Sequence, residues 1–148
     1  MRENIGLYRG KRIDNDEWVE GFLCKKYFHE APNDRYVIQY KTVQDGKMWR
    51  PDYMVAEVDP ETIGQYTGRI DKNKKRVFEG DIIRLCNGLP GFDVGFILWD
   101  DNDQAYLIVS DPVGKLILDD FGHYGRPEYY EVIGNIRDNP ELLEDADG

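Results

Sequence analysis

The chain has 148 residues, of which 41% are apolar and 13% are aromatic, and its formal net charge is −10 at pH 7. This apolar content can build a hydrophobic core, so the composition excludes a globally disordered chain. The start, MRENIGLYRGKR, lacks the apolar run of a signal peptide, and no stretch resembles a membrane span. We therefore expect a cytoplasmic protein that does not associate with membranes.

The negative charge is concentrated in the last third of the chain. Residues 1–60 carry 10 Lys/Arg and 11 Asp/Glu, residues 61–92 carry 6 and 4, and residues 93–148 carry 3 and 14. Binding to a phosphate backbone needs clustered cations, so the total charge disfavours a nucleic-acid binder. The acidic third either serves solubility alone or faces a protein partner with a basic surface.

Short aromatic and β-branched runs alternate with turn residues along the whole chain, which is typical of antiparallel strands. Gly21 interrupts one run and is expected to mark a bulge, and Gly68 is expected to end another through a positive φ. In chain order, the predicted strands are residues 6–9, 18–25, 35–42, 53–58, 65–67, 81–86, 93–99, 105–110, 115–118 and 129–136.

Only one segment has the features of a helix start. Asn139 is expected to act as an N-cap, Pro140 takes the first helical position, and Glu141 adds an acidic residue to the first turn. The sequence predicts one short C-terminal helix near residues 139–145.

These elements predict a mainly β fold in two small strand-rich halves. Proline and charge interrupt the pattern near residue 60, so we expect an N-terminal β subdomain over 1–60 and a C-terminal β subdomain over 61–148. Each half would be only marginally stable alone, so we expect the two to pack together, either as two subdomains or as one domain. The C-terminal half is expected to form a strongly bent antiparallel sheet or partial barrel.

The stretch GQYTGRIDKNKKRVFEGDIIRL, residues 64–85, is the most patterned of the chain. It reads as a cationic loop for an anion or nucleic acid, or as a hairpin whose exposed tip carries lysines. A phosphate cradle needs glycines that lead into a helix, and here strands are predicted on both sides, which favours the hairpin. The candidate contact residues are Arg69, Lys72, Lys74, Lys75 and Arg76.

Three ordered blocks resemble a known family. IGLYRGKRIDNDEWVEGF at the start, IGQYTGRIDKNKKRVFEGDIIRL in the centre and YEVIGNIRDNPELLED at the end are similar to the YopX family of phage and prophage proteins. The resemblance implies a mainly β fold and a phage context, and the family carries no agreed activity. The family's central turn usually reads DKNGK, whereas this chain has Lys74 at the glycine position. Either Lys74 accepts a left-handed conformation, or Asn73 takes it.

No constellation of residues points to catalysis, so no enzyme activity and no cofactor are expected. Cys24 and Cys86 lie within predicted strands and are expected to be buried thiols. His29 and His123 lack neighbours at metal-ligand spacing, and Ser110 is the one serine. A triad that uses Ser110 is not supported by any pattern.

The acidic turn that begins at Asp100 invites a calcium-loop interpretation, but the glycine and glutamate that such a loop requires are missing. The aromatic residues fit a core, a sheet face or a subunit interface better than a base-stacking platform. The number of strand edges predicts a homo-oligomer. The candidate partner-binding residues are Asp100, Asp101, Asp103, Asp119 and Asp120.

Two functions follow from these patterns. The first is a phage accessory protein that binds a basic protein partner through its acidic third. The second is a nucleic-acid-associated protein that uses the basic hairpin tip at residues 69–76.

Overall fold

A computed structural model describes residues 6–31, 33–42, 52–85, 94–110, 114–117 and 130–145. The protein is mainly β, its sheets are antiparallel and open, and the expected fold class is confirmed. The chain divides into two compact units, Met1–Tyr66 and Thr67–Gly148. The sequence had placed this division near residue 60.

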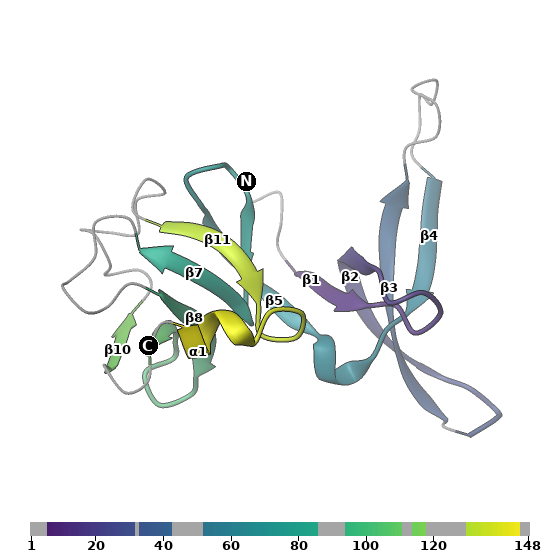
Figure 1. Cartoon of the computed structure of the whole chain (residues 1–148). Coiled ribbons are helices and arrows are strands. Elements are labelled where there is room, and N and C mark those ends of the chain that lie inside the picture. Colours follow the sequence, from purple (N-terminus) through teal and green to yellow (C-terminus); the bar gives the residue numbers. More distant parts are fainter. Residues whose placement is uncertain are drawn as a thin grey trace. The chain divides into compact units, whose positions relative to one another are not determined.

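The first unit is a meander of long strands that is continued by the strand leading into the second unit (Figure 1). Its strands follow the order β4-β3-β2-β1-β5, and a 3₁₀ turn joins β4 to β5. The elements are β1 (Leu7–Lys11), β2 (Trp18–Tyr27), β3 (Asp34–Thr42), β4 (Asp52–Glu57), η1 (Pro60–Thr62) and β5 (Gly64–Ile70).

The first unit has a small apolar core on one face of this sheet. Ile38 and Val58 are buried there, and a Cβ at Gly10 would lie 3.0 Å from Val58 and 3.3 Å from Ile38, so these neighbours would have to shift slightly. Gly21 is not at a bulge, because the pairing of β1 with β2 passes through it without a shift. A Cβ at Gly21 would instead strike the carbonyl of Gln39 on β3, so the residue must be glycine for a steric reason.

The second unit is built on a five-stranded sheet of order β10-β9-β8-β7-β11, beside the short β5–β6 hairpin. Its core cluster consists of Val77, Ile83, Leu85, Ile97, Ile108, Tyr130 and Val132. The elements are β6 (Arg76–Phe78), β7 (Asp81–Leu85), β8 (Val94–Asp100), β9 (Ala105–Ser110), β10 (Gly114–Ile117), β11 (Tyr130–Asn135) and α1 (Glu141–Asp145).

Two local expectations for the second unit are wrong. Gly68 does have a positive φ of 86°, but it does not end the strand, because β5 continues past it to Ile70. The short helix α1 forms, but the Asn139 side chain does not cap it: its Oδ1 accepts a hydrogen bond from the Asn135 N–H, 3.2 Å away. Asn139 therefore holds the end of β11. Within the described ranges, no helix combines the length and the apolar character needed to cross a bilayer.

A buried carboxylate ties the β5–β6 turn to β11. Asp71 is 1% exposed, and its Oδ1 accepts hydrogen bonds from the backbone N–H groups of Asn73 and Lys75, at 2.9 and 2.8 Å. Its Oδ2 accepts a third from the N–H of Val132, at 2.9 Å. Lys72 adds a backbone bond to the carbonyl of Tyr130. One side chain thus shapes the turn and attaches it to a strand far along the chain.

Replacing Asp71 with alanine should therefore destabilise the protein strongly. The change leaves three backbone donors without their acceptor, and we expect a loss of about 3 kcal/mol or more in the free energy of unfolding. Urea denaturation measures it. The control is Lys72→Ala, which removes the partly exposed ion pair with Glu131 and should cost under about 1 kcal/mol. Equal losses in the two variants would contradict this role of Asp71.

Candidate functional site

The basic candidate residues lie on and beside the β5–β6 hairpin of the second unit. Lys74, Lys75 and Arg76 are exposed, and Arg69 is half-buried on β5. The Lys72 ammonium is 3.1 Å from Oε2 of Glu131 on β11, so part of its charge is neutralised locally. The turn is flanked by strands and connects to no helix, so it lacks the geometry of a phosphate cradle.

Lys74 is the residue of this turn that adopts the left-handed conformation. Its φ is 65°, and its backbone N–H donates to the Asp71 carbonyl at 3.0 Å. Of the two alternatives left open by the sequence, Lys74 rather than Asn73 accepts the strain. The Asp71 carboxylate holds the turn in this shape through its bonds on both sides of Lys74.

The acidic candidate residues that the structure describes lie at the β8–β9 hairpin. Asp101 and Asp103 are exposed and Asp100 is half-buried. Part of their hydrogen-bonding capacity is used within the turn, because Asp100 Oδ2 accepts from the Asp103 N–H at 3.0 Å. Asp119 and Asp120 lie outside the described residues.

An aromatic pair stands beside these carboxylates. The indole N–H of Trp99 donates to Asp101 Oδ1 at 2.7 Å, and its backbone N–H donates to Oε2 of Glu79 at 3.2 Å. The Trp99 and Tyr106 rings meet edge to face, with centroids 4.9 Å apart. Trp99 is nevertheless 40% exposed. The hairpin end therefore presents a fixed, partly exposed indole next to negative charge.

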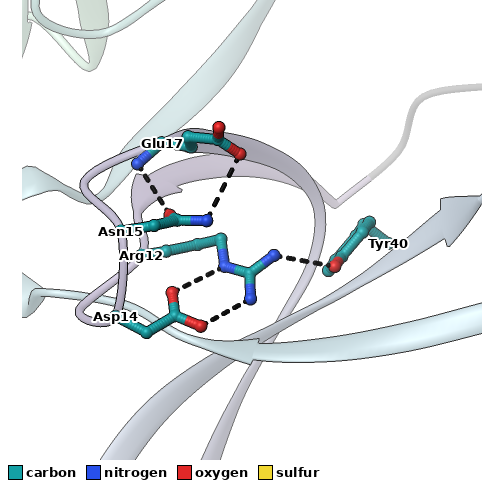
Figure 2. A network of polar contacts seen from close by, with 5 residues as sticks. All are labelled: Arg12, Asp14, Asn15, Glu17 and Tyr40. Atoms are coloured by element: carbon teal, nitrogen blue, oxygen red, sulfur yellow. Dashed lines mark hydrogen bonds and ion pairs between the residues drawn. The ribbon is translucent and has the colours of Figure 1, made fainter.

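In the first unit, a polar network closes the turn between β1 and β2 (Figure 2). The Arg12 guanidinium donates two hydrogen bonds to Asp14, at 2.9 and 2.6 Å, and a third to the Tyr40 hydroxyl at 3.1 Å. Asn15 and Glu17 make a second pair of contacts in the same turn. The bonds from Arg12 lower the pKa of the Asp14 carboxyl, and the bonds to Asp14 raise the pKa of Arg12.

The residues weighed for catalysis are not brought together among the described positions. Cys24 is exposed on β2, so the expectation of a buried thiol is wrong for it: it shares a sheet face with Phe22, which is also exposed. Ser110 is buried in β9, and His29 is exposed with its ring against the edge of Tyr27. Cys86 and His123 lie outside the described residues. No three His, Cys, Asp or Glu residues at described positions could hold a metal ion.

Sequence reasoning missed an exposed apolar strip on the first unit. Phe22, Gln39 and Val55 stand in register across β2, β3 and β4, and Phe22 and Val55 are about half exposed. Tyr53 and Met54 on β4 are exposed as well. The run Tyr-Met-Val shows no polar–apolar alternation, and this absence was the available indication that both sides of β4 are apolar.

A comparison with known protein families identifies the family of this chain. The model of the YopX protein family matches residues 7–144. The chain belongs to the YopX family. The crystal structure of protein EF1440 from Enterococcus faecalis is similar to this YopX chain, with 22% sequence identity and a TM-score of 0.48, over 92% of this chain and 96% of that one. No curated protein matches the sequence.

In this YopX chain, Lys74→Gly should stabilise the fold. Glycine adopts a φ of 65° without the steric penalty of a Cβ, and relief of that penalty should raise the free energy of unfolding by about 1 kcal/mol, less the extra entropy of the unfolded chain. Urea denaturation provides the measurement. Lys74→Ala is the matched control, because it removes the same charge and keeps the strained φ. A stabilisation of equal size in both variants would show that charge, and not backbone strain, is responsible.

The pKa of Asp14 should lie below the usual aspartate value of about 3.9. Because the carboxyl is more acidic in the folded state, its contribution to stability is present above about pH 3.9 and is lost as the pH falls through the lower folded pKa. An NMR titration of the side-chain carboxyl measures the shift. Arg12→Lys, which loses the two-pronged hydrogen bond, should move the pKa upward. Tyr40→Phe keeps that fork intact and should move it much less.

Proposed function

We propose that this YopX protein is a phage- or prophage-encoded accessory protein that acts in the host cytoplasm by binding another protein rather than by catalysis. Family membership supports the phage context. The observation that carries the binding role is the β8–β9 hairpin, where a partly exposed Trp99 is held beside Asp101.

The chemistry of this hairpin fits a protein partner with a basic face. Tryptophan is among the residues that contribute most to protein interfaces, because its large rigid ring becomes ordered at little entropic cost. The contacts to Tyr106 and Asp101 already fix the orientation of the indole, and Glu79 holds the backbone N–H of the same residue, which reduces the cost of binding further. The surrounding carboxylates speed the approach of a cationic surface and select against acidic partners.

The acidic third of the sequence adds a long-range field of the same sign. Residues 93–148 carry 14 acidic and 3 basic residues, so the segment that includes this hairpin attracts cations over a wider area than the turn alone. The basic tip of the β5–β6 hairpin is less suited to a nucleic acid, since Lys72 is paired with Glu131.

The test is affinity capture from host lysate with the immobilised full chain, followed by a binding titration with the captured protein. Changing Asp100, Asp101 and Asp103 to asparagine keeps acceptor atoms for the turn and removes the charge. We expect binding to weaken at least about tenfold and to lose most of its salt dependence. Trp99→Ala should weaken it by a similar factor. A second variant that also contains Asp119→Asn and Asp120→Asn tests the rest of the acidic set.

The matched control is Glu20→Gln, Glu30→Gln and Glu141→Gln, which removes the same number of exposed charges elsewhere. It should leave the affinity nearly unchanged. Equal loss in the control would mean that only net charge matters. Capture of DNA or RNA in place of a protein, abolished by Lys74→Glu with Lys75→Glu, would contradict the proposal in favour of the nucleic-acid function.

A further inference from the structure

β4 is the end strand of the sheet in the first unit (Figure 1). It carries exposed apolar side chains on both sides. Tyr53, Met54 and Val55 are consecutive, and each is at least 50% exposed. Because successive side chains of a strand point to opposite faces, the exposed apolar surface lies on both faces of this edge. The unpaired backbone groups of such an edge form a template on which another strand can pair.

The outer edge of β4 also has backbone groups that pair with no residue in the described part of the chain. Val58 lies directly after β4 and donates its N–H to the Tyr36 carbonyl of β3. Every second residue of a strand directs its backbone groups to the same side, so Ala56 and Met54 also direct theirs toward β3. The residues between them, Tyr53, Val55 and Glu57, direct their backbone N–H and C=O groups away from β3, toward the outer edge. The carbonyl of Glu57 accepts from the Ile13 N–H at 3.0 Å. At Tyr53 and Val55, no described residue pairs with the outer edge.

The outer edge of β11, in contrast to that of β4, is blocked by another part of the chain. On β11, the Tyr130 carbonyl accepts from Lys72 and the Val132 N–H donates to the Asp71 carboxylate, so the β5–β6 turn blocks that edge. β6 has 3 residues and β10 has 4, against 6 in β4. β4 is therefore the longest edge strand within the described part of the chain that is left available for pairing.

We infer that β4 pairs antiparallel with β4 of a second copy of this chain, in a two-fold symmetric dimer centred on Met54. In this register Tyr53 of each copy faces Val55 of the other, and the two form hydrogen-bonded pairs. Met54 faces Met54 in a non-hydrogen-bonded pair. An aromatic residue opposite a β-branched one is a favourable cross-strand pair, and the symmetry uses it twice.

Backbone geometry selects this register from the alternatives. An antiparallel ladder pairs outward residues with outward residues, which excludes every shift by one residue. A two-fold axis at Val55 would place Tyr53 opposite Glu57, whose carbonyl Ile13 already occupies. An axis at Tyr53 would place Val55 opposite Pro51, which has no N–H to donate. Only the axis at Met54 uses the groups that the fold leaves open.

The charge of the first unit permits such an approach. Residues 1–60 carry 10 Lys/Arg and 11 Asp/Glu, so two copies meet through nearly neutral segments although each whole chain has a net charge of −10. The inference does not involve the β8–β9 hairpin, so it stands or falls separately from the function proposed above.

Sedimentation of the full chain provides the first test. At about 100 µM the wild-type protein should contain a dimer that dissociates on dilution, as expected for a small interface. The Tyr53–Val55 pair occurs twice in the dimer, and Val55→Lys places a charge in both. This change should weaken the dimer at least about tenfold. Ile136→Lys is the control, because it adds the same charge at an exposed apolar position of the second unit and should not change dimerisation. A wild-type protein that stays monomeric at that concentration overturns the inference.

Cysteine cross-linking tests the register, in a Cys24→Ser background so that the exposed thiol does not interfere. Met54→Cys puts the two new thiols in a directly opposed pair, with Cα atoms about 4.5 Å apart, inside the range that a disulfide spans. Mild oxidation should therefore give covalent dimer. Tyr53 does not face Tyr53 of the second copy in this register, so Tyr53→Cys should cross-link much more slowly. The Cys24→Ser protein without a new cysteine sets the baseline. Faster cross-linking through Tyr53→Cys, or none through Met54→Cys, would overturn the proposed pairing.

Discussion

The second unit depends on the buried carboxylate of Asp71, whose hydrogen bonds all come from backbone N–H groups. Burial of an isolated carboxylate costs several kcal/mol, and the protein offsets this by directing three N–H groups at Asp71. The same bonds fix the left-handed Lys74 and block the outer edge of β11. A single side chain therefore sets the shape of a surface turn and the end of a sheet. Neither can change unless the Asp71 carboxylate becomes exposed to water or loses its hydrogen bonds.

This constraint gives the two charged hairpins different structural roles. The basic turn is fixed by contacts that serve the fold, and Lys72 is occupied with Glu131. The acidic turn also has internal bonds, but it keeps a large aromatic ring at the surface beside them. A structural turn needs no exposed tryptophan, since packing of that ring inward would remove more apolar area from water. That difference is why the acidic hairpin, rather than the basic one, is the better candidate for recognition.

Local patterns in the sequence were sufficient for most of the strands and for the family, but not for β6, for the end of β5 or for the contacts that join the strands. Asp71 was recognisable as the start of a turn, because an aspartate followed by Asn73 has the right chemistry for a local hydrogen bond. Its bond to Val132 has no sequence pattern, since a backbone N–H is the same at every position. The exposure of Cys24 and of β4 was equally hidden, because apolar residues look alike whether the sheet face above them is covered or open. The spacing of Arg12 and Asp14 in a predicted turn could have indicated their pairing.

The bond between Asp71 and Val132 joins residues that are 61 positions apart. Closing a loop of that length costs entropy that only the assembled sheet can offset, so the contact belongs to the late stage of folding. During synthesis the turn emerges from the ribosome long before β11 does, and its carboxylate must wait in water for its last partner. A nascent chain of this protein therefore has an incomplete second unit until β11 has been translated, and the edge where β11 will pair stays open to other strands for that time.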